Sequence, residues 1–223
     1  MKATLVVACA LVAALVAQLQ PYSPARYQGG GLPPLPVLAV GGGQAFVQLT
    51  IGPSGGVSEA IPLRSTPPFT TSVVEAVSGW QFSAAMQDKL DKEGKPEGPK
   101  PVPSKVLVAG VFRPPTLVTP TLGEAPKNVA SAAADVAYPT SVHTPPFPPK
   151  AQASGVVLIE ARVDESGKVS AAAVIGSAPP FDAPALEAAW QWRFRPARIN
   201  GRATATYVYL LFGFPQPLTS PRP

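Results

Sequence analysis

The sequence has almost none of the side chains from which most catalytic and metal sites are built. Cys9 is the only cysteine and His143 the only histidine among 223 residues. Cys9 lies in an apolar N-terminal run, so the chain beyond it has no disulfide, no thiolate nucleophile and no cysteine metal ligand. His143 lies among prolines, without the companion residues of a metal site or a catalytic arrangement. We therefore expect no catalytic residue, no metal and no cofactor, and predict that the protein is not an enzyme.

Charge is also scarce. Only 14% of the residues are charged, and the formal net charge of +5 is spread along the chain. A balance this weak does not favour a nucleic-acid partner. Asp164 and Glu165 are adjacent carboxylates, but they fall in a predicted hairpin turn, where exposure leaves their charges untuned. The composition therefore gives no sign of nucleic-acid binding or of carboxylate catalysis.

The N-terminus has the pattern of a targeting segment. Met1 and Lys2 precede an apolar run that ends at Ala17, and the chain turns polar at Gln18. Residues 1–17 are thus a signal peptide or a short membrane anchor. An anchor that spans a bilayer needs about 20 apolar residues, which favours cleavage. We predict a periplasmic protein that is anchored in the inner membrane if the segment is uncleaved, and that contacts the membrane only there.

The chain repeats itself after 112 residues. Residues 34–85 align without a gap on residues 146–197, and 18 of the 52 positions are identical. The shared positions include a Ser-Gly turn, a Pro-Pro-Phe triplet and a Trp-x-Phe sequence at Trp80 and Trp192. Prolines, glycines and aromatic residues do not match in this way by chance, so we interpret the pattern as an internal duplication.

The second copy predicts a hairpin, a helix and a last strand. Residues 157–163 and 169–175 alternate apolar and polar side chains around a turn at 164–167, which is typical of two antiparallel strands with one buried face. Asp182 is placed as a helix N-cap, and the predicted helix ends at Arg195. Trp192 and Trp80 are expected to fill the core. Residues 203–214 predict a third strand, rich in β-branched and aromatic side chains.

The domain prediction follows from these patterns. We place an extended linker at 18–33, a first, degraded unit at 34–113 with a charged loop at 86–105, a Pro/Ala-rich linker at 114–145, a second unit at 146–214 and a disordered tail at 215–223. The fold class is α+β, with two tandem units that are each a helix packed on a three-stranded antiparallel sheet.

The second unit resembles a known family. It begins with Pro146-Phe147-Pro148, continues through a Ser-Gly turn, and ends its helix with Trp192-Arg193-Phe194 before a proline. Together these features resemble the C-terminal domain of TonB proteins, the energy transducers that reach outer-membrane receptors. The first unit resembles it in degraded form, since Leu35 stands where the aromatic residue is expected.

The resemblance implies a domain that binds proteins and performs no chemistry. In that family the last strand offers an edge to which a receptor segment adds as an extra strand, in keeping with the template that unpaired edge amides and carbonyls provide. The implied partner is an outer-membrane receptor or the proton-channel complex of the TonB system, and the implied role is energy transduction for transmembrane transport. The partner-binding residues would be Phe147, Pro148, Trp190, Thr204, Thr206, Tyr207, Val208 and Tyr209.

One alternative stays open from the sequence. The protein is then a structural envelope protein whose two units pair their sheets with each other and bind no receptor. The two hypotheses differ in the last strand. If the first unit covers residues 203–212, no receptor segment can add to that strand.

Overall fold

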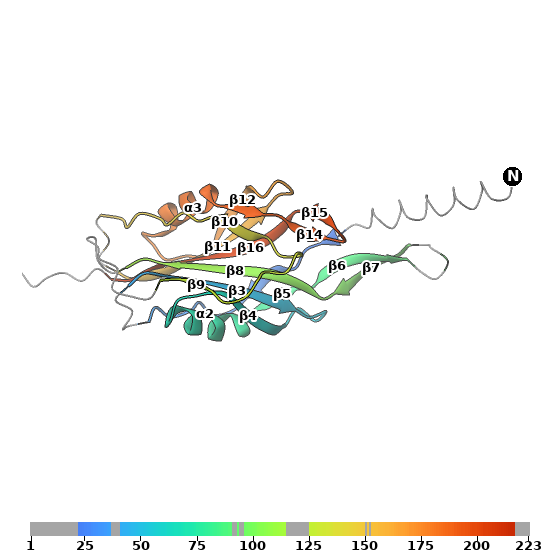
Figure 1. Cartoon of the computed structure of the whole chain (residues 1–223), viewed down its shortest axis with the longest axis horizontal. Helices are drawn as coiled ribbons and strands as arrows, with labels where there is room; N and C mark the ends of the chain where they lie inside the picture. The colour runs from blue at the N-terminus through green and yellow to red at the C-terminus, as the bar shows by residue number, and fades with distance from the viewer. Residues whose placement is uncertain are drawn as a thin grey trace, which may run out of the picture.

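The chain forms an α+β structure around a seven-stranded sheet (Figure 1). The computed structural model describes residues 22–36, 41–90, 93, 96–114, 125–149, 151 and 153–216. The predicted targeting segment at 1–17 and residues 217–223 of the predicted tail lie outside this range. Within the described residues, no helix has the length and apolar character needed to cross a membrane.

Each unit contributes three antiparallel strands and one helix to this architecture. The first unit supplies β3 (Gly43–Ile51), β4 (Val57–Ser65), α2 (Phe69–Ser78) and β8 (Ser104–Phe112). The second unit supplies β11 (Gly155–Val163), β12 (Val169–Gly176), α3 (Asp182–Gln191) and β16 (Thr206–Phe214). The sheet order is β12-β11-β16-β8-β3-β4-β9, where β9 is Lys127–Asn128. The predicted α+β class is confirmed.

The two units share this sheet through their last strands. β16 pairs with β8 in parallel, with a register that runs from Val208 opposite Leu107 to Gly213 opposite Phe112. Its other neighbour, β11, pairs with it in antiparallel fashion over its whole length. The prediction that the last strand is a free edge is therefore wrong for Val208 to Gly213, because the first unit occupies that side.

The two helices cover opposite faces of the sheet (Figure 1). Alternate residues of the same strand go to different cores: Leu210 and Phe212 pack with α3, whereas Tyr209 and Leu211 pack with α2. Because side chains alternate between the faces of a strand, the two cores lie on opposite sides of the sheet. The middle strands are consequently buried on both faces.

This double burial corrects one prediction for β11. The alternation along this strand predicted one buried face, with Leu158 and Glu160 turned to solvent. Both are buried, at 0% and 8% exposed. The second layer of packing comes from the first unit and from the chain segment that precedes it, which the pattern of a single strand does not reveal.

The repeated Ser-Gly and Trp-x-Phe motifs meet in space. Gly167 has φ +82°, and a Cβ there would lie 1.9 Å from the carbonyl oxygen of Phe194. The amide of Phe194 donates to the carbonyl of Gly167 at 2.8 Å. Gly55 and Phe82 of the first unit repeat this contact, with a 2.9 Å hydrogen bond. Glycine is required at these turns because the backbone of Phe82 or Phe194 lies too close for a side chain, and because φ is positive.

Both helix-terminal tryptophans fill the core as expected, and each also contacts the other unit. Trp80 and Trp192 are fully buried. The ring centroid of Trp192 lies 6.3 Å from that of Phe46, and the centroid of Trp80 lies 6.2 Å from that of Tyr209. The indole N–H groups donate to backbone carbonyls 49 residues earlier in the chain, at 2.8 Å from Trp80 and 2.9 Å from Trp192. The cores of the two units are therefore interlocked.

The helix of the second unit is shorter than predicted. It ends at Gln191, because Trp192 turns to extended backbone with ψ 151°. Asp182 is the first helical residue rather than the N-cap, and its carboxylate accepts hydrogen bonds from the amide of Ala178 and the hydroxyl of Ser177. The residues after Trp192 instead form β13 (Arg193–Arg195), which pairs with β10 (Tyr138–Ser141).

The two predicted linkers are part of the fold. The described part of the first contains β1 (Tyr22–Ser23) and β2 (Arg26–Gly29), and Ala25 between them is 1% exposed. The second contains β9 and β10, with Val136 and Ala137 in the core. β2 pairs with β5 (Gln81–Ser83) as β10 pairs with β13. The structural correspondence thus reaches further toward the N-terminus than the sequence match.

The charged segment at 86–105 was expected as a solvated loop, and this is wrong. It carries β6 (Ala85–Leu90) and β7 (Pro96–Val102), which form an antiparallel hairpin that β1 extends. The second unit has a shorter hairpin at the same place, β14 (Ala197–Ile199) with β15 (Arg202–Thr204). The frequent charged residues and prolines favoured a loop in the prediction, because the side chains of this hairpin are mostly solvated.

The interlocked cores predict that both units unfold together. Leu49→Ala in β3 removes a fully buried side chain and is expected to lower the free energy of unfolding by about 2–5 kcal/mol. In a chain that carries Trp80→Phe and Trp190→Phe, the one remaining tryptophan, Trp192 in the core of the second unit, gives the fluorescence signal. Urea unfolding followed by this signal should shift with Leu49→Ala by the same amount as unfolding followed by far-UV circular dichroism. An unmoved Trp192 transition would show that the units unfold independently.

Candidate protein-binding surface

Three of the four predicted partner-binding residues in β16 are buried. Thr206 is 6% exposed, Val208 is 1% exposed and Tyr209 is fully buried. The backbone of Val208 and Tyr209 faces β11 on one side and β8 on the other. Val208 and Tyr209 are therefore inaccessible to a strand from another protein as long as β8 stays in place.

The other predicted partner-binding residues differ in their accessibility. Thr204 lies in β15, outside the main sheet, and is half-buried, as is Tyr207. Phe147 packs on the aromatic core, with its ring centroid 5.5 Å from that of Phe181, and Pro148 beside it is also half-buried. Trp190 projects from α3 and is 44% exposed. The structure does not bring these residues together with the buried part of β16 into one open surface.

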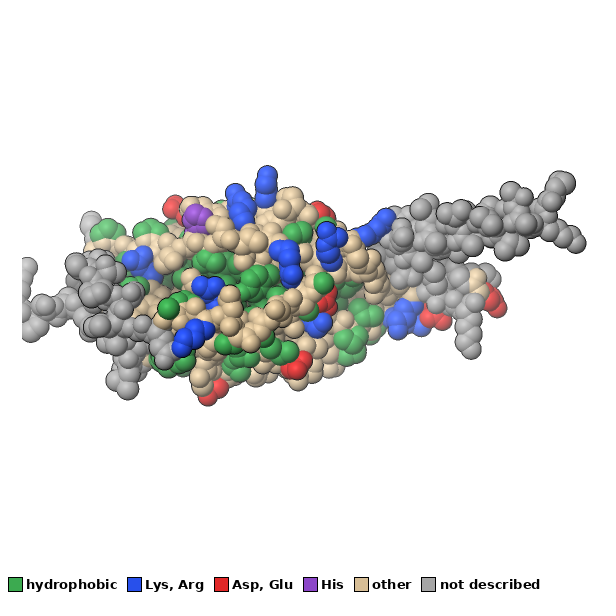
Figure 2. Space-filling model, in the orientation of Figure 1, with side chains coloured by type: hydrophobic (Ala, Val, Ile, Leu, Met, Phe, Trp, Pro, Cys, Tyr) green, Lys and Arg blue, Asp and Glu red, His purple; other side chains and the backbone are tan. Residues whose placement is uncertain are grey.

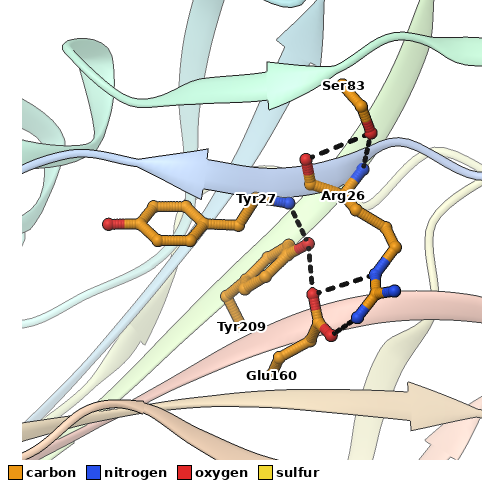
Figure 3. A network of polar contacts seen from close by, with 5 residues as sticks. All are labelled: Arg26, Tyr27, Ser83, Glu160 and Tyr209. Atoms are coloured by element: carbon orange, nitrogen blue, oxygen red, sulfur yellow. Dashed lines mark hydrogen bonds and ion pairs between the residues drawn. The ribbon is translucent and has the colours of Figure 1, made fainter.

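A polar network lies where the N-terminal segment crosses the second unit (Figure 3). Arg26 of β2 forms an ion pair with Glu160 of β11. The hydroxyl of Tyr209 accepts a hydrogen bond from the amide of Tyr27 at 2.7 Å and lies 3.4 Å from a carboxylate oxygen of Glu160. Ser83 completes the network by bonding the backbone of Arg26. The network satisfies polar groups that the sheet would otherwise bury alone.

The electrostatics of this network favour the charged Arg26 and the neutral Tyr209. The hydrogen bond to Glu160, followed by its charge, raises the pKa of Arg26 above its usual value. Burial raises the pKa of Tyr209 well above its usual value, and the neighbouring carboxylate adds to this shift. The guanidinium of Arg26 also lies 4.7 Å from the centroid of the Tyr207 ring. The result is a bridge between N-terminal segment and sheet in which every charge has a partner.

Two polar clefts lie near this bridge. The larger has a volume of about 470 Å³ and is lined by Tyr22, Arg26, Arg162 and Glu165 among others. The smaller, of about 200 Å³, lies between the two hairpins and is lined by residues such as Lys105, Asp135 and Arg198. Within the described part of the chain, no group of three or more His, Cys, Asp and Glu side chains is placed to hold a metal ion.

The arginines that follow α3 bind backbone rather than forming a free basic patch. Arg195 donates to the carbonyls of Ala133 and Val136, at 2.9 and 3.3 Å. Arg193 donates to the carbonyls of Trp190 and Trp192. Figure 2 shows basic side chains spread over the visible face of the molecule. These arginines fix local structure, which weakens any interpretation as a phosphate or nucleic-acid site.

Comparison with known proteins assigns the second unit to a family. Residues 144–214 match the family described as the Gram-negative bacterial TonB protein C-terminal domain. The second unit is a TonB C-terminal domain. The resemblance predicted from the sequence is thereby confirmed for this unit. A search of curated proteins found no match to the chain.

The match supports a protein-interaction role for the second unit. TonB C-terminal domains belong to a family of envelope proteins that interact with other proteins and transduce energy without catalysis. In the sheet, the strand next to β16 of this domain is β8, the last strand of the first unit. The place at which a receptor strand is expected to add is therefore filled from within the chain.

Sequence reasoning missed the network of Arg26, Tyr27 and Glu160. Arg26 lies outside the aligned repeat, in a segment interpreted as a linker, and the structurally equivalent residue is Tyr138. Glu160 looked like an ordinary solvent-facing residue of an alternating strand. Nothing in the sequence indicates that Glu160 is buried and needs a cation, and the cation that pairs with it, Arg26, lies 134 residues away in the chain.

The raised pKa of Tyr209 predicts a loss of stability in alkali. The folded state keeps the phenolic proton at a pH where the unfolded chain releases it, so this stabilisation is complete below about pH 10 and is lost as the pH rises above it. Tyr209→Phe should therefore flatten the fall in the free energy of unfolding between about pH 10 and pH 12. The measurement is urea unfolding at each pH. A slope equal to that of the wild type would contradict the role of Tyr209.

Proposed function

We propose that this chain is a periplasmic protein-binding protein in which two TonB-type units act as each other's strand partner. Of the two hypotheses from the sequence, we favour the structural envelope protein whose units pair with each other over the receptor-binding transducer. The reason is that β8 occupies the side of β16 to which a receptor strand would add. The family assignment of the second unit supports protein interaction, and the apolar N-terminal run supports export.

The observation that carries the proposal is the parallel pairing of β8 with β16. Strand addition requires a row of unpaired backbone amides and carbonyls. The register from Val208–Leu107 to Gly213–Phe112 uses these groups along most of the strand. A receptor segment would have to take the place of β8 before it could bind there.

Replacing β8 would also uncover both cores. Leu107, Ala109 and Val111 pack in the core under α3, whereas Val106 and Val108 pack in the core under α2. All five are buried. Removing apolar area from a core costs about 25 cal/mol for each Å² exposed, so exchange of β8 for a short peptide is strongly unfavourable. Because β8 fills both cores and a short peptide would not, the sheet in which β8 pairs with β16 is favoured.

Binding to other proteins then falls to the surfaces that remain exposed. Of the residues predicted to bind a partner, Trp190 on α3 is the most accessible. Tryptophan is among the side chains most enriched at the centres of protein interfaces. Trp190 is thus the proposed contact for a partner that approaches the helix side, and Phe147 acts mainly in packing.

The test is a covalent lock between β8 and β16. In a full-length Cys9→Ser chain, Ala109→Cys with Leu210→Cys joins two residues that face each other in the register. Leu49→Cys with Val106→Cys joins β3 to β8 as a matched control that leaves β16 unlocked. Each protein, oxidised and reduced, is used to capture proteins from a Gram-negative envelope extract.

We expect the wild type and both locked proteins to capture the same partners, with no outer-membrane receptor among them. If the wild type captures receptors and the β8–β16 lock alone abolishes this, β8 opens and the proposal is wrong. Recovery of those receptors on reduction would then identify the chain as a transducer that exposes β16.

A further inference from the structure

The outer edge of β12 carries no further strand in the part of the chain that the structure describes. β12 is the last strand of the sheet on the side of the second unit, and among the described residues only β11 pairs with it. Its eight residues, Val169–Gly176, contain no charged residue and no proline. Natural proteins usually blunt such edges with lysine, proline, a bulge or a covering segment, because free amides and carbonyls recruit further strands.

The opposite edge of the same sheet carries charged residues, a proline and a covering segment. The strand β4 carries Glu59, Pro62 and Arg64, and β9 pairs with its end. The amides of Val129 and Ala130 also donate to the carbonyl of Leu63, at 2.9 and 3.4 Å. The segment from β9 onward thus seals this edge.

Equivalent residues at the two edges differ sharply in burial. Leu63 of β4 and Ile175 of β12 are 112 residues apart and occupy equivalent positions in their units. Each lies at a β-bulge in the pairing with the neighbouring strand, β3 for Leu63 and β11 for Ile175. Leu63 is 0% exposed, whereas Ile175 is 38% exposed. The position that the segment after β9 covers in the first unit is thus more exposed in the described part of the second unit.

Two exposed apolar side chains belong to the outermost strand and to the helix of the second unit. The large hydrophobic residues found exposed in the described part of the chain are Val129, Ile175 and Trp190. Ile175 lies on β12, and Trp190 lies on α3, the helix that packs on β12 and β11.

We propose that β12 pairs in antiparallel fashion with β12 of a second copy, joining two chains into one continuous sheet. In such a pairing the two-fold axis runs perpendicular to the sheet, so both α3 helices lie on one face. Strands are about 4.8 Å apart, and a helix centred between β11 and β12 would lie about 10 Å from its symmetry mate. Packed helices are about 8–10 Å apart, so the two helices would be in contact.

The observations favour a second copy over a foreign peptide. The edge carries small and apolar side chains, chiefly Ala171, Ala173 and Ile175, so an identical strand faces it without opposed like charges. Nothing on β12 selects a charged peptide. The same contact brings together the helices that carry Trp190, which a lone extended peptide would leave uncovered. This inference is independent of the proposed function, since β12 and β16 are different strands.

The test is the oligomeric state of the full-length chain in a mild detergent. Sedimentation velocity from about 1 µM to about 100 µM is expected to show a dimer in reversible equilibrium. Ile175→Lys adds two symmetry-related charges to the paired edge and should weaken the dimer by about tenfold or more. Val129→Lys, at a residue that is 57% exposed on the opposite edge, is the matched control and should leave the dimer intact.

A second readout locates the contact. Amide hydrogen exchange in 169–176 should slow as the protein concentration rises, and Ile175→Lys should remove this dependence while circular dichroism stays unchanged. A wild type that stays monomeric at the highest concentration overturns the proposal. So does a dimer that survives Ile175→Lys, or one whose protection appears elsewhere in the chain.

Discussion

The parallel pairing of β8 with β16 is the contact on which the rest of the structure depends. It turns two three-stranded sheets into one and places α2 and α3 on opposite faces. Each half of the sheet therefore has one face covered by its own helix and one left for other parts of the chain. Small sheets with one bare apolar face are marginal, and two such units stabilise each other by covering what neither can cover alone.

The covering segments follow from this arrangement. The chain before each unit crosses the bare face of the other unit before it enters its own. Residues around Tyr27 lie over Tyr209 and Glu160 of the second unit, and Val136 packs with Phe46 of the first. Gln48 and Glu160 are equivalent positions that each bind a crossing segment, Gln48 through the amide of Ala133 and Glu160 through Arg26. The segments that look like linkers are thus part of the core.

Much of one unit can be predicted from the sequence, because its signals are local. The hairpin 157–175, the Ser-Gly turn and the buried Trp192 depend on neighbours that are close in the chain. The relation between units could not be predicted in this way. Residues 22–33 and the equivalent residues 134–145 share little sequence, and Arg26 meets Glu160 across 134 residues. The hairpin β6–β7 escaped because its solvated side chains resemble those of a loop.

One sign of the shared sheet was present in the last strands. In an antiparallel sheet with one solvated face, apolar and polar residues alternate, whereas a strand covered on both faces is apolar throughout. Residues 106–112 read Val-Leu-Val-Ala-Gly-Val-Phe, and residues 208–212 read Val-Tyr-Leu-Leu-Phe, with no polar alternation in either. Both strands therefore carry the composition of interior strands. In the TonB-type unit of this chain, the last strand is suited to a permanent neighbour that covers it, and the first unit supplies that neighbour.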